Sequence, residues 1–180
     1  MKKIKIIISI INFLFINLFS GIKLSKFKIF NFENYCIKPL DKNNFWKILT
    51  LYQDNNLGLR LNLDKKILYK FLGKKYCYII IDKRNNTFVG MGMYYFNRKD
   101  IKEKTIHEGY IGLKKEYREK GLGTISRKYA LEHFSKLKFL KGVSSRVSLD
   151  NIPSLKGNLK LGFKIEKNIL ILMKKKKEYI

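Results

Sequence analysis

Short apolar runs of strand length alternate along this chain with stretches in which apolar residues recur every three or four positions. The short runs predict strands at Tyr35–Pro39, Tyr76–Ile81, Thr87–Phe96, Thr105–Leu113 and Gly142–Ser148. The periodic stretches predict helices from Asp41 to Gln53, from Asn62 or Asp64 to Gly73, from Thr124 to Lys138, and from Asn151 onward. Strands that alternate with helices in this way favour one layered α/β domain.

The first thirty residues break this alternation. Three lysines among the first five residues precede an apolar run from Ile6 to Phe19, which Ser9, Asn12 and Asn17 interrupt. A cleaved signal peptide needs small residues at its cut, whereas Leu and Phe stand shortly before Gly21. A membrane span needs about 20 apolar residues, and this run is shorter. We therefore favour a retained amphipathic helix on a membrane surface, with a targeting segment and a short span as alternatives.

The length of 180 residues allows one domain over residues 31–180, behind the N-terminal segment of residues 1–30. The formal net charge of +25 would suit a nucleic-acid partner. Only six of the 39 basic residues are arginine, however, and lysine lacks the planar fork that reads base edges. We therefore expect no specific nucleic-acid partner, and a weak attraction to anionic lipids or acidic substrates instead.

The two cysteines, Cys36 and Cys77, both lie in apolar strand-like runs, and the sequence has no CxxC pattern or Cys/His cluster. This usage predicts two buried free thiols and no metal site. Gly90 and Gly92 share one face of a predicted strand, where they are either bends or room for a ligand.

The segment 111–124 carries the clearest chemistry. A predicted strand ends, a short basic loop with Gly121 and Gly123 follows, and a helix begins. Glycines let a backbone turn so that its N–H groups face outward, and a helix N-terminus adds partial positive charge. These features predict an anion site suited to a pyrophosphate, to which Arg118 and Lys120 add positive charge. An ordinary strand-to-helix turn is the alternative.

The loop matches the signature R/Q-x-x-G-x-G/A of the GNAT acetyltransferases with the run Arg118-Glu119-Lys120-Gly121-Leu122-Gly123. A second segment, Asn151 to Phe163, is similar to that family's Asn-started helix closed by Gly-Phe. The resemblance covers about Glu33 to Lys175. It implies the GNAT fold, in which a mixed, mostly antiparallel central sheet is flanked by helices and splayed between its fourth and fifth strands. It also implies an acetyl-CoA-dependent N-acetyltransferase.

By this resemblance, acetyl-CoA is the co-substrate and the chain holds it chiefly through its backbone. The pyrophosphate would lie on the loop and helix start, at Arg118, Glu119, Lys120, Gly121, Leu122, Gly123 and Thr124. The thioester would lie near Ile111–Leu113, and Asn151 would hold the pantetheine arm or cap the last helix.

Two positions depart from the family pattern. Glu119 stands where many relatives carry another glycine. Asn158 stands where many members carry a tyrosine that protonates the leaving thiolate, and an amide cannot serve as that acid. Asn158 could still hydrogen-bond the sulfur, with water or Tyr129 giving the proton.

An amine attacks a thioester only in its neutral form, so a base must remove a proton. His107 lies close to where several GNAT subfamilies place a base, and Glu108 is its neighbour. Successive strand residues face opposite sides of a sheet, so one of the two faces the acceptor unless a bulge intervenes. His107 has the better pKa for the task, while His133 is expected to be structural. Candidate acceptor-pocket residues are Tyr94, Tyr95, Ser145 and Arg146.

The expected acceptor is a small-molecule amine. An amino sugar of a surface-polysaccharide precursor is favoured over a polyamine or a protein amine, because an anionic nucleotide-sugar suits the positive chain. The enzyme would then be cytoplasmic and attached to the inner membrane face, and a homodimer stays open. The alternative function is a GNAT-like acyl-CoA-binding module without catalysis, because Asn158 replaces the usual acid.

Overall fold

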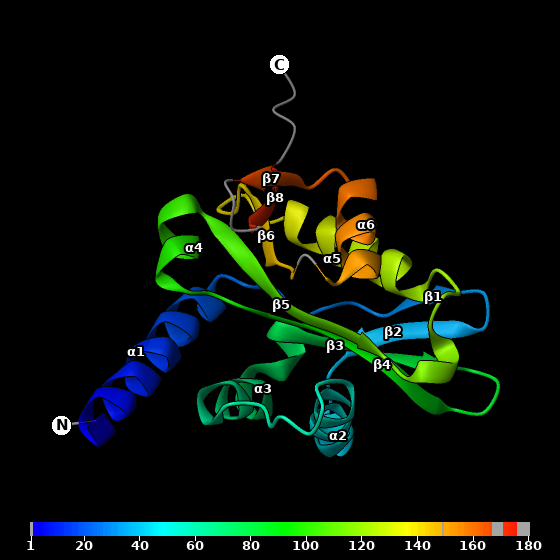
Figure 1. The fold of residues 1–180 in the computed structure, drawn as a ribbon, viewed down its shortest axis with the longest axis horizontal. Coiled ribbons are helices and arrows are strands. Elements are labelled where there is room, and N and C mark those ends of the chain that lie inside the picture. Colours follow the sequence, from blue (N-terminus) through cyan, green and yellow to red (C-terminus); the bar gives the residue numbers. More distant parts are fainter. Residues whose placement is uncertain (1, 149, 167–170, 176–180) are drawn as a thin grey trace.

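The strands lie side by side in a single eight-stranded sheet in the computed structural model, which describes residues 2–148, 150–166 and 171–175 (Figure 1). The sheet order is β1-β2-β3-β4-β5-β6-β8-β7, and every neighbouring pair is antiparallel except β5 and β6, which are parallel. The strands are β1 (Phe30–Phe32), β2 (Tyr35–Pro39), β3 (Cys77–Asp82), β4 (Thr87–Tyr95), β5 (Thr105–Leu113), β6 (Gly142–Arg146), β7 (Lys164–Glu166) and β8 (Ile171–Lys175).

Helices cover both faces of this sheet. They are α1 (Lys2–Ile22), α2 (Phe45–Asn55), α3 (Leu63–Tyr76), α4 (Arg98–Glu103), α5 (Leu122–Ser135) and α6 (Ile152–Lys160), with 3₁₀ turns at Lys42–Asn44 and Lys115–Tyr117. Figure 1 shows α5 and α6 on one face and α1, α2 and α3 on the other. The core between them is built on β3, whose six residues are all buried. The mixed, mostly antiparallel α/β architecture predicted from the sequence is confirmed.

The sheet opens between β5 and β6. These two strands pair only from Thr105 with Gly142 to Glu108 with Ser145, so the second half of β5 has no partner on that side among the described residues. Just beyond the last pair, Gly109 is a bulge in the ladder between β4 and β5. A bulge bends and twists its strand, which separates the end of β5 from β6. This is the predicted splay, since β5 and β6 are the fourth and fifth of the strands expected from the sequence.

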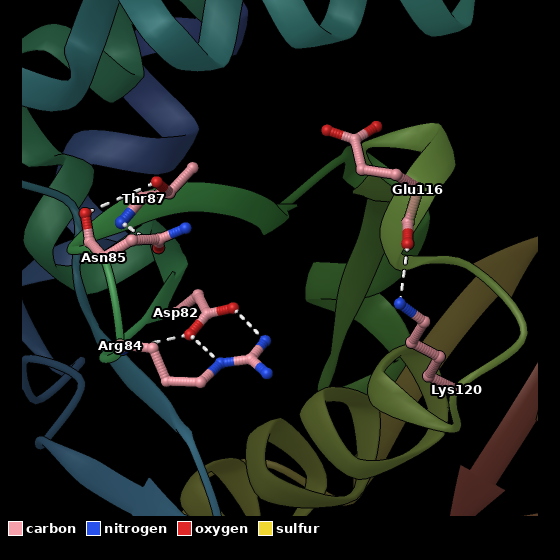
Figure 2. A network of polar contacts seen from close by, with 6 residues as sticks. All are labelled: Asp82, Arg84, Asn85, Thr87, Glu116 and Lys120. Atoms are coloured by element: carbon pink, nitrogen blue, oxygen red, sulfur yellow. Dashed lines mark hydrogen bonds and ion pairs between the residues drawn. The ribbon is translucent and has the colours of Figure 1, made fainter.

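The hairpin between β3 and β4 is closed by its own turn residues (Figure 2). Asp82, at the end of β3, accepts hydrogen bonds from the backbone and side chain of Arg84, and these bonds lower the pKa of Asp82 to about 2. Asn86 has a φ of +52°, the left-handed conformation that asparagine tolerates in turns. The turn predicted at residues 84–86 is therefore where the sequence placed it.

The second half of α1 is packed into the domain. Asn17 is fully buried, and its side-chain amide donates to the carbonyl of Phe96 and accepts from the N–H of Phe96. The hydroxyl of Tyr76 donates to the Asn17 carbonyl, and Leu24 and Phe27 continue into the core. By length and composition alone, the stretch Lys3–Ile22 could also cross a membrane.

Two glycine interpretations need correction. Helix α3 runs through Gly73 to Tyr76 instead of ending there. Gly73 serves close packing instead, since a Cβ on it would approach Leu40 to 2.7 Å. A Cβ on Gly92 would lie 2.3 Å from the Tyr78 ring, and one on Gly90 would lie 2.5 Å from a Leu113 methyl. Neighbouring side chains, and not a ligand, occupy that space.

Candidate active site

The glycine loop lies where the sequence predicted it, between the end of β5 and the start of α5. Gly121 is the N-cap of α5 and has a φ of +76°, which glycine adopts without strain. The next residue, Leu122, is buried in the core. The N–H groups of Thr124 and Ile125 both donate to the Gly121 carbonyl. The loop therefore delivers the chain into the first turn of a helix, as an anion-binding site requires.

The backbone N–H groups of this loop are available as hydrogen-bond donors. Among the described residues, none accepts a hydrogen bond from the N–H groups of residues 119–123. A Cβ on Gly121 would meet nothing within 4 Å, and one on Gly123 would meet only a Leu113 methyl at 3.9 Å. The protein's own packing thus does not demand a glycine at position 123. The missing side chain leaves open the space through which a pyrophosphate would reach these N–H groups, so the residues fit the predicted ligand.

Side chains hold the loop in place. Arg118 donates through Nε to the carbonyl of Leu113 and through Nη2 to the side chain of Asn55 in α2. Asn55 donates to the same Leu113 carbonyl at 3.1 Å. Lys120 Nζ donates to the carbonyl of Glu116 at 2.9 Å, across the base of the loop (Figure 2). Arg118 therefore ties three segments together, a role that the sequence did not reveal because Asn55 lies 63 residues away.

Glu108 points from β5 toward α5 and α6, where it forms a buried ion pair. Arg127 Nε lies 3.0 and 2.9 Å from the two Glu108 carboxylate oxygens, and both residues are almost fully buried. The hydroxyl of Ser145 also donates to Glu108. Asn158 Nδ2 donates to Ser145 at 3.4 Å, while the buried Asn158 Oδ1 has no partner among the described residues. This cluster lies where β5 and β6 begin to separate.

His107 points to the opposite face of β5 and lines a pocket of about 270 Å³. The bulge follows Glu108, so the alternation of His107 and Glu108 is preserved, as strand geometry predicts. The pocket is lined by Tyr95, Asn97, Lys99, Asp100, Glu103, His107, Ser144 and Arg146. His107 Nδ1 lies 2.9 Å from the Ser144 hydroxyl, and the Ser144 hydroxyl donates to Asp100 at 2.6 Å. Burial lowers the pKa of His107, which keeps its imidazole neutral at neutral pH.

The remaining predicted residues divide between this pocket and other places. Tyr95 and Arg146 line the pocket, whereas Ser145 contacts Glu108 on the other face, and Tyr94 packs its ring against Phe134 beneath α5. Asn151 caps α6 by accepting from the Ser154 N–H. Ile111 is half-buried and pairs with Gly92 of β4, in the part of β5 that lies beyond its pairing with β6.

Tyr129 and His133 both make contacts within the protein core. The Tyr129 hydroxyl donates to the Lys28 carbonyl, and its ring stacks on Phe30. His133 stacks on Phe27 with 4.4 Å between ring centroids, in the structural place expected for it.

The sequence profile of the Acetyltransferase (GNAT) family matches residues 45–163, which include both β5 and the glycine loop. The chain belongs to this family. It is therefore an acetyltransferase of the acetyl-CoA-dependent type, as the loop signature indicated. No curated protein sequence matches the chain.

Solved structures share the fold at low sequence identity. A ribosomal-protein-S5-alanine acetyltransferase from Vibrio fischeri is 17% identical, with a TM-score of 0.63 over 85% of this chain and 99% of that one. Arabidopsis thaliana Naa50, solved with a bisubstrate analogue CoA-Ac-MVNAL, is 16% identical, with a TM-score of 0.62 over 78% and 96%. A spermidine N-acetyltransferase from Vibrio cholerae, solved with CoA and spermine, is 14% identical, with a TM-score of 0.59 over 78% and 92%.

Proposed function

We propose that this enzyme transfers the acetyl group of acetyl-CoA to a primary amine by direct attack, with His107 as the base. The observation that carries the proposal is the arrangement of β5. At one end of this strand, His107 lines a polar pocket, and at the other end the backbone leaves β6 and leads into the open glycine loop. One strand thus links a site for the acceptor to a site for pyrophosphate.

In the proposed step, His107 removes one proton from the bound ammonium group. The free amine nitrogen forms a bond to the thioester carbonyl carbon, the carbon–sulfur bond breaks, and CoA leaves as a thiolate that takes up a proton. The second amine proton is lost to water, because His107 already holds the first, and His107 then gives its proton to the thiolate or to water. The loop N–H groups hold the pyrophosphate and so fix where the thioester lies along β5.

Asn158 does not prevent this reaction. A thiol pKa of about 8.5 makes the thiolate a tolerable leaving group without an acid. The Asn158 amide lies beside the splay and can orient the sulfur through a hydrogen bond. We expect Asn158→Tyr to leave the rate similar or to raise it modestly.

His107 is favoured over Glu108 because Glu108 is committed to Arg127. We expect His107→Gln to lower turnover by about 10²–10⁴-fold, the usual contribution of a general base, with CoA binding intact. Glu108→Gln alone would leave the buried Arg127 unpaired, so the informative comparison is the double variant Glu108→Leu with Arg127→Leu. If the double variant, correctly folded, abolishes turnover and His107→Gln does not, the assignment is reversed.

We propose an amino sugar on an anionic carrier as the acceptor. Arg146 gives the pocket a cationic group, and the chain as a whole carries a net charge of +25, which disfavours a polycation. A screen with radiolabelled acetyl-CoA should compare nucleotide-linked amino sugars, polyamines and short peptides as acceptors. Labelling of a polyamine or a peptide would replace the proposed acceptor class. Labelling of none, with CoA bound, would favour a binding module without catalysis.

We also propose that α1 attaches the enzyme to the inner face of a membrane, where acetyl-CoA is supplied. Its exposed side carries Ile4, Ile7, Ile8, Ile11, Phe15, Leu18, Phe19 and Ile22, and lysines lie at both ends of the helix. Vesicles of phosphatidylglycerol and phosphatidylcholine should sediment the full chain but not the variant Ile4→Ser/Ile7→Ser/Ile11→Ser. If the vesicles sediment neither protein, and these changes instead dissociate a dimer in solution, the same face is a homodimer interface.

A further inference from the structure

We propose that Asp100 and Ser144 are positioning residues that fix His107 with its proton on Nδ1, leaving Nε2 free to accept a proton in the pocket. We call the hydrogen-bonded series Asp100, Ser144 and His107 the relay. Its functional meaning rests on the proposed function, in which His107 is the base. The relay itself is a statement about hydrogen-bond direction, and it can be measured without any substrate.

The direction of the hydrogen bonds in the relay follows from Asp100, a buried residue of α4. Its Oδ1 accepts from the hydroxyls of Thr105 and Ser144, at 2.9 and 2.6 Å, and its Oδ2 accepts from the N–H of Asn97 at 3.0 Å. Both oxygens are therefore acceptors. An ionised carboxylate is acceptor-only, so three converging donors match the charged form of this side chain.

The relay continues through Ser144. A serine hydroxyl has one proton, and the short contact to Asp100 uses it. Toward His107, the Ser144 oxygen is then left with lone pairs only. Because Ser144 Oγ and His107 Nδ1 are 2.9 Å apart, His107 Nδ1 must carry the proton of that hydrogen bond. In a neutral imidazole, the other ring nitrogen is then the acceptor.

Nε2 is open to the pocket. Nε2 makes no hydrogen bond to a described residue. It is also not a fully buried atom, so a bound amine in the pocket can reach it. Burial is the largest influence on the pKa of His107 and lowers it. Asp100 of α4 and Glu108, on the other face of β5, raise this pKa, while Arg146 of β6 and Lys65 of α3 lower it. The Tyr95 ring of β4 packs on the imidazole at 4.9 Å between centroids.

Asp100→Asn should reverse the relay. The Asn97 N–H requires an acceptor, so the new amide places its oxygen there and its NH₂ toward Ser144. Ser144 would then accept from position 100 and donate to His107 Nδ1, which moves the ring proton to Nε2. Holding a catalytic histidine in the wrong tautomer costs about 10⁴-fold in turnover in a Ser-His-Asp triad. We expect kcat to fall by about 10²–10⁴-fold, with an unchanged KM for acetyl-CoA.

Nitrogen NMR of ¹⁵N-histidine-labelled full-length protein tests the relay directly, because the chain has only two histidines and His133→Phe assigns the other. The proposal predicts protonated Nδ1 in the wild type and protonated Nε2 in Asp100→Asn. Protonated Nε2 in the wild type overturns it, as does an unchanged tautomer in the variant. If the wild type shows protonated Nδ1 but acetylates no amine, the proposed function fails while the relay stands.

Two further variants separate positioning from general stability. Ser144→Ala should lose the Nδ1 preference and the wild-type pH profile of kcat, while Ser144→Thr, which keeps the hydroxyl, should retain both. Asn97→Ala removes the side-chain cap of α4 but leaves the relay atoms in place, so it should lower stability by about 1 kcal/mol and keep the wild-type tautomer. A shifted tautomer in Asn97→Ala would show that the packing of α4, and not the relay, determines which nitrogen of His107 is protonated.

Discussion

At the scale of the residue, Glu119 combines two unfavourable features in the glycine loop. Its φ of +62° is a left-handed conformation that a non-glycine residue adopts at a cost of about 1–2 kcal/mol. Its carboxylate also adds negative charge beside the N–H groups expected to bind phosphates. These features explain why the family pattern favours glycine at this position.

Glu119→Gly should therefore strengthen CoA binding with little change in stability. Relief of the left-handed strain is partly offset by the greater freedom of glycine in the unfolded chain, about 0.4–1 kcal/mol, which leaves at most a small gain in stability. Removal of the nearby charge has no such offset. Calorimetric titration should show a lower Kd for CoA at nearly constant melting temperature. A weaker affinity would mean that the carboxylate helps to shape the loop.

His133 makes stability depend on pH. Burial lowers its pKa to about 4, below the unfolded value of about 6.5, so the unfolded chain binds more protons between these values. The free energy of unfolding should fall as the pH drops from about 6.5 toward 4 and stay level above that window. His133→Phe should reduce the fall in melting temperature between pH 7 and pH 5. An equal fall in the melting temperature of the wild type and His133→Phe would mean that His107 or the carboxylates, and not His133, cause the pH dependence.

At the scale of the element, α1 is part of the domain as well as an exposed apolar surface. The Asn17 amide completes the hydrogen bonds of Phe96 just beyond β4, in the way that an added strand would. Removing the amide leaves buried backbone groups unsatisfied.

Asn17→Ala should thus destabilise the protein by about 1–3 kcal/mol for each group left unpaired. Asn12→Ala is the matched control, because it makes the same change five positions earlier in the same helix, at a less buried residue. Urea unfolding of the two variants measures the difference. Similar midpoints would mean that α1 is not docked as described.

The sequence was most informative about elements with a strong local pattern. The strands Tyr35–Pro39 and Thr105–Leu113 were predicted to the residue. Helix α4 was missed because six residues are too few for a clear period, and β1, β7 and β8 are equally short or weakly patterned. The glycine loop was found from its motif.

The relay and the ion pair could not be found from local pattern. Asp100 and Ser144 are 44 residues apart, and Glu108 and Arg127 are 19 apart, on different elements. Only the pairing of β5 with β6 and the packing of α5 bring them together. The assignment of His107 and Glu108 to opposite faces did follow from the sequence, because strand alternation is a local rule.

At the scale of the whole molecule, β5 connects the parts of the proposed reaction. His107 and Leu113 are six positions apart in the sequence, roughly 20 Å along a strand. The pocket stands at one end, the glycine loop at the other, and the splay between β5 and β6 lies alongside. Helix α1 lies in the layer of α1, α2 and α3, away from the loop at the start of α5 (Figure 1). Membrane contact would therefore leave the loop accessible.

Titration of CoA into the wild type and Gly123→Val tests the central claim most directly. A Cβ at this position would meet only a Leu113 methyl at 3.9 Å and the backbone is not left-handed, so we expect the variant to melt like the wild type while its side chain blocks the approach of the pyrophosphate. Lys128→Val, on the exposed side of the same helix, is the control. The account predicts that the wild type and Lys128→Val bind CoA and that Gly123→Val loses binding by at least about tenfold, or 1.4 kcal/mol. Equal CoA affinity in a folded Gly123→Val variant would contradict it.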